Sequence, residues 1–182
     1  MTLISSYGCV ELTHPCKSRH NLGAGITRGQ KMTTKVAVIG AGYMGSAIIR
    51  GLQNQPGVHL RVFDNDPRKI AQHIAHVKEA SLLFRTPEKN EIVILAIPPQ
   101  AFAQFCAFHK TLQNSVALVI SVMAGIQIET IRSGLGCTKI VRAIPNTPCE
   151  IQEGMTIFTT STEAIPCVET AHELLSRLGK TI

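Results

Sequence analysis

The sequence predicts an α/β fold in which a mostly parallel, doubly wound sheet carries helices on both faces. From residue 35 onward, short β-branched runs alternate with helix-length stretches, which is the pattern of successive βαβ units. A glycine-rich turn follows the first of these runs directly. Hydrophobic residues make up 45% of the 182 residues and charged residues 16%, the balance of an ordinary globular domain.

The expected elements follow one another in strand–helix order. The run at 35–39 is the first strand, and the stretch 44–54 is the first helix. The second helix has clear start signals, because Asp66 is a good N-cap residue and Pro67 fits the first helical turn. The remaining pattern predicts strands at 60–63, 92–96, 116–121, 139–143 and 155–159, helices at 67–75, 101–110, 128–133 and 163–178, and the opening of another strand at 179–182.

The first 31 residues read differently from the rest. They show neither helical nor strand periodicity and mix Gly, Ser, His and basic residues, so we expect a disordered extension over 1–31 and a single domain over 32–182. The simplest explanation of this extension is a mis-called start, with Met32 as the true first residue, because Met32 lies where a fold of this kind usually begins. An organelle-targeting segment is disfavoured, because Glu11 is present and no amphipathic pattern appears.

Composition narrows the possible functions. No apolar run approaches the length of a membrane span. The formal charge of +6 comes from scattered basic residues with only two Tyr and no Trp, which disfavours a nucleic-acid surface. The six cysteines show no metal-site spacing. We therefore expect a cytoplasmic protein with no metal, and Cys149 as a nucleophile is a weak alternative because no base is placed to activate it.

The glycine-rich turn is the first motif that carries chemistry. Gly40, Gly42 and Gly45 form a GxGxxG pattern between a predicted strand and a predicted helix, the context that makes this pattern specific for a Rossmann dinucleotide site. Gly40 permits the tight turn, Gly42 allows the backbone to approach a pyrophosphate, and Gly45 allows close packing of helix on strand. The predicted cofactor-binding residues here are Ile39, Gly40, Ala41, Gly42, Tyr43, Met44 and Gly45.

An acidic residue stands where such a site would hold the adenosine ribose. Asp64 ends the second predicted strand, a little over 20 residues after Gly40, and its carboxylate would favour NAD by repelling a 2′-phosphate. Arg68 and Lys69 follow shortly and could neutralise that phosphate. The cofactor is therefore expected to be NAD(P)H: Asp64 favours NAD, whereas Arg68 and Lys69 permit NADP or are simply surface charges.

Three further blocks extend this pattern into a family resemblance. They are Ile94-Leu95-Ala96-Ile97-Pro98-Pro99-Gln100, Ser121-Val122-Met123-Ala124-Gly125-Ile126, and Arg142-Ala143-Ile144-Pro145-Asn146-Thr147-Pro148 followed by Glu153-Gly154-Met155-Thr156. Together with the glycine turn, they give residues 32–182 a resemblance to the pyrroline-5-carboxylate reductase family. All four blocks end predicted strands, where open α/β sheets bind ligands. The resemblance adds Ala96, Ile97, Pro98, Pro99, Met123, Ala124, Gly125 and Asn146 to the expected cofactor-binding residues.

The resemblance implies hydride transfer from NAD(P)H to the imine of 1-pyrroline-5-carboxylate, a small-molecule substrate, giving L-proline. Three positions depart from the family pattern: Pro98 replaces a Lys, Ile144 a Met, and Gln152 a Gly. Family members continue into a helical domain that forms homo-oligomers and most of the substrate pocket. This chain ends before that domain, so we expect an incomplete substrate site and an exposed last helix around Leu174, Leu175 and Leu178.

No residue is assigned a catalytic role from the sequence. The histidines His73, His76, His109 and His172 fall on predicted helices or their edges, and we interpret them as surface or packing residues. Two alternatives stay open. The chain could be another dehydrogenase domain of the β-hydroxyacid or imine type, which would not be expected to carry Pro-Asn-Thr-Pro, or a non-catalytic cofactor-binding or interaction module.

Overall fold

A computed structural model describes residues 33–84, 86–109, 112 and 115–182 of the chain. The prediction of a disordered extension over 1–31 lies outside these residues, as does the last residue of the helix expected at 101–110. Within the described part, no helix combines the length and apolarity that crossing a bilayer would take.

One mostly parallel sheet of eight strands organises the described residues, as predicted. The strand order is β3-β2-β1-β4-β5-β6-β7-β8. Strands β1 to β6 run parallel, β7 is antiparallel to β6, and β8 is parallel to β7. Their bounds are β1 Thr34–Ile39, β2 Val58–Phe63, β3 Glu79–Ser81, β4 Glu91–Leu95, β5 Val116–Ser121, β6 Ile140–Ile144, β7 Gly154–Thr160 and β8 Gly179–Thr181.

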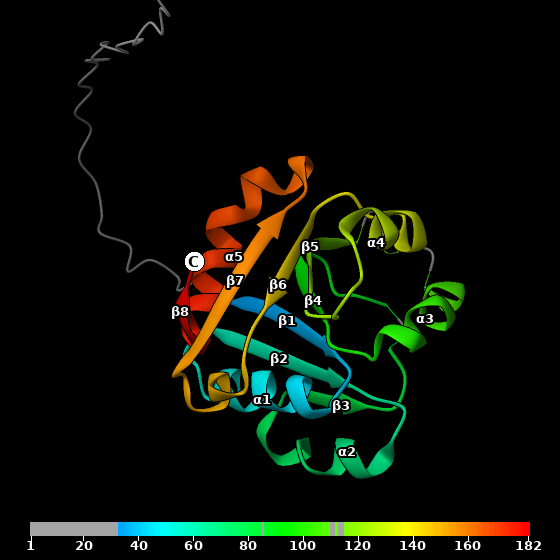
Figure 1. Cartoon of the computed structure of the whole chain (residues 1–182). Helices are drawn as coiled ribbons and strands as arrows, with labels where there is room; N and C mark the ends of the chain where they lie inside the picture. Colours follow the sequence, from blue (N-terminus) through cyan, green and yellow to red (C-terminus); the bar gives the residue numbers. More distant parts are fainter. Residues whose placement is uncertain (1–32, 85, 110–111, 113–114) are drawn as a thin grey trace, which may run out of the picture. The chain divides into compact units, whose positions relative to one another are not determined.

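Helices cover both faces of this sheet (Figure 1). Buried side chains of α1, α2 and α5 pack on one face, and those of α3 and α4 pack on the other. The central strands supply both cores by alternation, since Val36 and Val38 belong to the first cluster and Ala37 and Ile39 to the second. The helices are α1 Tyr43–Leu52, α2 Pro67–Ala71, α3 Phe102–Phe108, α4 Ile128–Leu135 and α5 Val168–Leu175, with 3₁₀ turns η1 Ile74–His76, η2 Pro99–Ala101, η4 Thr147–Ile151, η5 Thr162–Cys167 and η6 Ser176–Leu178.

The first helix is also held by elements that come much later in the chain. Helix α1 contacts both η4 and η6. A Cβ on Gly51 would collide with the carbonyl oxygen of Cys149 and would come within 2.6 Å of Leu178 Cδ2. The absence of a side chain at Gly51 therefore allows the end of the described chain to pack directly on α1.

Three expectations about elements need correction. The short strand β3 was not predicted. The helix expected at 163–178 is divided into η5, α5 and η6, because Pro166 lies inside η5 and has no N–H to continue an α-helical ladder. The expected exposure around Leu174, Leu175 and Leu178 is wrong: these side chains are buried against α1 and its neighbours.

Candidate functional site

The three glycines of the turn between β1 and α1 occupy different environments. Gly40 has φ +100°, and a Cβ there would lie 2.6 Å from the carbonyl oxygen of Ala96. A Cβ on Gly45 would overlap the carbonyl oxygen of Gly40, whereas a Cβ on Gly42 would meet no protein atom within 4 Å. Steric crowding thus requires glycine at positions 40 and 45, whereas open space lies beside Gly42.

Asp64 lies at the end of β2, as predicted, but its carboxylate is already engaged. One oxygen accepts a hydrogen bond from the Ala41 N–H at 2.7 Å, and the other accepts from the Asp66 N–H at 2.8 Å. The Lys69 ammonium lies 3.6 Å away, and only 7% of the Asp64 side chain is exposed. Asp64 therefore ties the glycine turn to the end of β2.

Of the two basic residues after Asp64, only Lys69 faces the cavity described below. The Arg68 guanidinium is held by both carboxylate oxygens of Asp66, at 3.1 and 3.0 Å, and 87% of its side chain is exposed. This contact holds the pKa of Asp66 below its usual range. Arg68, which the sequence predicted to bind the cofactor, thus contacts Asp66 and does not line the cavity.

A cavity of about 560 Å³ opens beside the glycine turn, at the carboxyl ends of β1, β2 and β4. Five of the predicted site residues contribute to its wall: Ile39, Gly40, Asp64, Ile97 and Pro98. The rest of the wall is formed by Phe63, Asn65, Lys69, Leu82, Leu83, Phe84, Ala101, Gln104, Phe105, Phe108 and His109.

Aromatic side chains make one wall of this cavity, and the sequence analysis missed them. Phe63 meets Phe84 edge-on with ring centroids 5.0 Å apart, and Phe105 lies 4.3 Å from the ring of His109. Burial lowers the pKa of His109 and so favours the neutral form of its ring. No motif signals these residues, because they come from segments that are brought together only by the fold.

The remaining predicted residues lie along the same edge of the sheet without lining that cavity. Main-chain hydrogen bonds join the ends of the strands there, from Ala96 N–H to the Ile39 carbonyl at 2.8 Å and from Val122 N–H to the Leu95 carbonyl at 3.0 Å. The side-chain oxygen of Asn146 accepts a hydrogen bond from Met155 N–H at 2.7 Å, which leaves its amide N–H groups available to a ligand. Tyr43, Ala124 and Gly125 are exposed, and Pro99 and Met123 are partly or fully buried.

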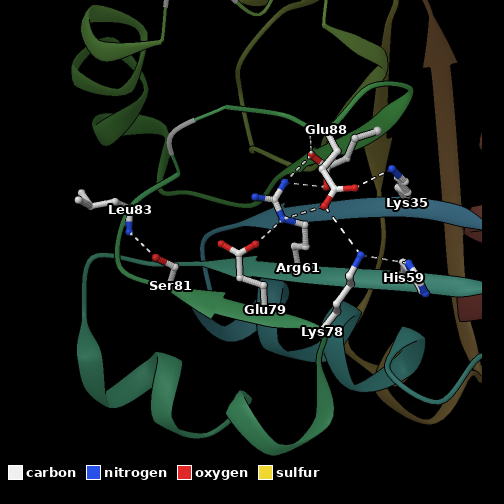
Figure 2. A network of polar contacts seen from close by, with 9 residues as sticks. Lys35, His59, Arg61, Lys78, Glu79, Ser81, Leu83 and Glu88 are labelled. Carbon is white, nitrogen blue, oxygen red and sulfur yellow. Dashed lines mark hydrogen bonds and ion pairs between the residues drawn. The ribbon is translucent and has the colours of Figure 1, made fainter.

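A network of charged side chains lies next to Phe63 of the aromatic wall and was also not predicted. Figure 2 shows Arg61 reaching toward the carboxylates of Glu79 and Glu88. Its guanidinium donates to Glu79 at 2.8 Å and to both oxygens of the fully buried Glu91 at 3.0 and 3.1 Å. The same guanidinium lies 4.9 Å from the centroid of the Phe63 ring, so the network packs against the aromatic wall of the cavity.

Cys149 is not suited to act as a nucleophile. Its side chain is fully buried, and burial, reinforced by the charge of Glu150, raises the pKa of its thiol to about 11. The weak alternative considered from the sequence therefore receives no support from the geometry. In the described segments, no cluster of three potential metal ligands occurs.

The strand order, the glycine turn and the cavity at the carboxyl ends of the strands together define a Rossmann dinucleotide-binding domain. A family model described as NADP oxidoreductase coenzyme F420-dependent matches residues 35–125. The chain belongs to this family.

Curated relatives are pyrroline-5-carboxylate reductases. The enzyme of Haemophilus influenzae is 33% identical over 156 residues, covering 81% of this chain and 56% of the relative. That of Pasteurella multocida is 34% identical over 155 residues, covering 80% and 56%. The chain thus spans little more than half the length of the curated relatives it matches.

Solved structures agree with this grouping. A pyrroline-5-carboxylate reductase from Coxiella burnetii has a TM-score of 0.72 at 26% identity, covering 82% of this chain and 58% of that one. Pyrroline carboxylate reductase of Plasmodium falciparum, solved with NADP bound, has a TM-score of 0.67 at 22% identity, covering 82% and 56%; at that identity it supports the fold alone.

Proposed function

We propose that this chain is the cofactor-binding part of a pyrroline-5-carboxylate reductase, in which a hydride passes from NADPH to the imine carbon of 1-pyrroline-5-carboxylate and gives L-proline. The observation that carries the proposal is the open space at Gly42. It lies at the N-terminus of α1, where free N–H groups and the helix dipole attract phosphate. Crowding at Gly40 and Gly45 holds the turn in the shape that leaves this space.

The cavity fits the adenosine half of the cofactor. Apolar and aromatic side chains surround most of it, and the polar groups of Asn65, Lys69 and Gln104 lie among them, the composition expected of a pocket for a flat base with a polar sugar. The cavity also borders Gly40 and Ile97, so a dinucleotide could extend from it across the glycine turn toward the ends of β4 and β5.

We further propose NADPH rather than NADH as the preferred cofactor. Asp64 lines the cavity, but its carboxylate already accepts two main-chain hydrogen bonds and only 7% of its side chain is exposed. The ammonium group of Lys69 also lines the cavity and lies 3.6 Å from that carboxylate. A 2′-phosphate would gain a charge-assisted contact from Lys69. This reverses the preference that the position of Asp64 suggests in the sequence.

When bound, the reduced nicotinamide supplies the hydride, and this chain's residues supply binding and orientation. The N–H groups of the glycine turn hold the pyrophosphate. The turns after β4, β5 and β6 hold the ring through Ile97, Pro98, Ala124 and Asn146, and Pro98 offers an apolar ring where the family pattern has a cation. A proton must also reach the imine nitrogen, and we assign no residue to that step.

Titration of the purified chain with NADPH and with NADH by calorimetry, together with an assay of pyrroline-5-carboxylate reduction, tests the proposal. We expect NADPH to bind more tightly than NADH. Lys69→Ala should weaken NADPH about tenfold and NADH by less than about twofold, which is the scale of one charge-assisted hydrogen bond. Arg68→Ala is the matched control, because Arg68 is held by Asp66 away from the cavity.

The outcomes separate binding from catalysis. Failure of both nucleotides to bind would refute the proposed function. Binding without turnover is the result expected of a cofactor-binding part on its own, whereas turnover would show that this chain also carries a working substrate site. Equal affinity for the two nucleotides in both the wild type and Lys69→Ala would refute only the proposed NADPH preference.

A further inference from the structure

Two consecutive buried hydrogen bonds connect His73, just after α2, to the glycine turn between β1 and α1. The imidazole Nε2 of His73 lies 3.1 Å from the hydroxyl oxygen of Ser46, and that hydroxyl lies 2.9 Å from the carbonyl oxygen of Ala41. His73 is 1% exposed and Ser46 7% exposed. His73 follows α2, whereas Ser46 belongs to α1, so two elements that are not adjacent in the chain meet at the turn.

The direction of each hydrogen bond follows from the chemistry of the groups. A carbonyl oxygen can only accept, so the single hydroxyl proton of Ser46 is donated to Ala41. The Ser46 oxygen must then accept from His73, which places the imidazole proton on Nε2. Burial, together with the charges of Arg50 and His76, lowers the pKa of His73, in agreement with a neutral ring that carries one proton.

These contacts fix two peptide planes at the centre of the turn. The Ala41 carbonyl belongs to the peptide that contains the Gly42 N–H, and in a planar trans peptide the two groups point in opposite directions. Holding the carbonyl toward α1 therefore directs the Gly42 N–H away from it. The preceding peptide is held by Asp64, which accepts from the Ala41 N–H at 2.7 Å.

We propose that His73 is a positioning residue for dinucleotide binding, acting through Ser46 to hold the Ala41–Gly42 peptide so that the Gly42 N–H faces the pyrophosphate. The inference rests on the proposed function of the glycine turn. It assigns a binding role to a histidine that never touches the ligand. It also explains why a polar pair is buried at this point of a packed interface, where two apolar side chains would have no hydrogen bonds to satisfy.

The test compares a ligand that has a pyrophosphate with one that lacks it. Affinities for NADPH and for adenosine 2′-monophosphate are measured by calorimetry on wild type, His73→Leu, His73→Gln, Ser46→Ala and the His73→Leu/Ser46→Ala double variant. Thermal unfolding of each variant is followed in parallel. His76→Leu is the matched control, because His76 lies three residues further on and is exposed.

We expect His73→Leu and Ser46→Ala each to weaken NADPH about fivefold to tenfold, the scale of one hydrogen bond. The double variant should be no weaker than the more affected single variant, because both changes break the same chain of contacts. Affinity for adenosine 2′-monophosphate should stay within about twofold. His73→Gln should restore most of the NADPH affinity, since its amide can donate to Ser46.

Different results would overturn the proposed role of His73 for different reasons. Equal weakening of both ligands would show a general structural role, and normal NADPH affinity in folded His73→Leu or Ser46→Ala would remove any role for the chain of contacts. If His73→Leu does not fold, Ser46→Ala alone decides, because it deletes one oxygen at a position next to a helix terminus. Absence of NADPH binding by the wild type would refute the proposed function itself and this role with it.

Discussion

The three glycines of the turn differ in whether a side chain would fit, although they belong to one motif. The sequence predicted three different jobs for Gly40, Gly42 and Gly45, and the steric environments differ in the same sense: two positions are crowded by main chain and one is open. The sequence could predict these differences because the steric limits on the three glycines arise within one strand, the turn and the helix that follows it. The binding role of the open position stays a prediction.

Alanine substitutions should separate the two kinds of glycine. Gly42→Ala should leave the melting temperature nearly unchanged, because φ is −71° there and its Cβ meets no protein atom, yet it should abolish dinucleotide binding by filling the space for phosphate. Gly40→Ala should destabilise the fold, since φ is +100° and the Cβ would approach Ala96. Calorimetric titration and thermal unfolding of both variants check this. Tight NADPH binding by Gly42→Ala would contradict it.

The buried cysteines should be unreactive in the folded protein. Burial raises the pKa of Cys137 and of Cys149 to about 11, so at pH 8 only about one thiol in a thousand is the reactive thiolate. Of the four described cysteines, the half-buried Cys167 should react first with iodoacetamide, as measured by mass spectrometry. Reactivity of Cys149 should rise only above about pH 10 or on unfolding. Rapid modification of native Cys149 at pH 8 would count against this packing.

At the scale of elements, the charged network centred on Arg61 links the four strands β1 to β4. Arg61 comes from β2, Glu79 from β3 and Glu91 from β4, and Glu88, which precedes β4, binds Lys35 of β1 at 2.7 Å. The Lys35 ammonium holds the pKa of Glu88 below its usual range. The short edge strand β3 is thereby joined to the centre of the sheet by side chains as well as by its ladder.

Removal of the buried carboxylate should cost far more than removal of the exposed one. Glu91→Gln leaves Arg61 without its buried partner, and breaking such a pair costs about 3 to 5 kcal/mol. Glu79→Gln removes a half-exposed partner and should cost less than about 1 kcal/mol. Urea unfolding of the two variants measures the difference. Similar losses would mean that the network does not depend on Glu91.

The elements that the sequence predicted are those with strong periodic patterns. Seven strands and the helices α1 and α4 agree within about two residues. The central parallel strands were predictable because buried parallel strands are runs rich in β-branched residues. The strand β3 was missed because Glu79-Ala80-Ser81 is short, polar and partly exposed, so no pattern distinguishes it from a loop. Arg61 lies 18 residues from Glu79 and 30 residues from Glu91 in the sequence, and Phe63 and Phe84 come from different segments, so no local pattern reveals these contacts.

At the scale of the whole described domain, apolar side chains remain exposed on β6 and β7. Ile144 and Ile157 are directly paired across the two strands and are 60% and 56% exposed, and Met155 is 46% exposed. The same face of β6 carries Arg142, whose Nε is buried and has no hydrogen-bond partner among the described residues. Exposed apolar side chains therefore lie on this face of the sheet, whereas the expected exposure of the last helix is wrong.

This apolar face should make the chain associate at high concentration. Ile144→Thr/Ile157→Thr keeps β-branched side chains on the strands and reduces the exposed apolar area, so it should lower association without lowering the melting temperature. Sedimentation velocity at several protein concentrations measures the effect. Ile74→Thr, at an exposed position on η1, is the control. Unchanged association in the double variant would place the responsible surface elsewhere.

The packing of η4 and η6 on the first helix also affects when the domain can form. The ribosome delivers β1, the glycine turn and α1 first, whereas Cys149 and Leu178, which pack against Gly51, emerge about 100 residues or more after it. Until then, one side of the helix behind the turn stays uncovered. A nascent chain should therefore acquire its affinity for nucleotide only after Leu178 has emerged, so ligand could stabilise the completed domain but could not help its first half to fold.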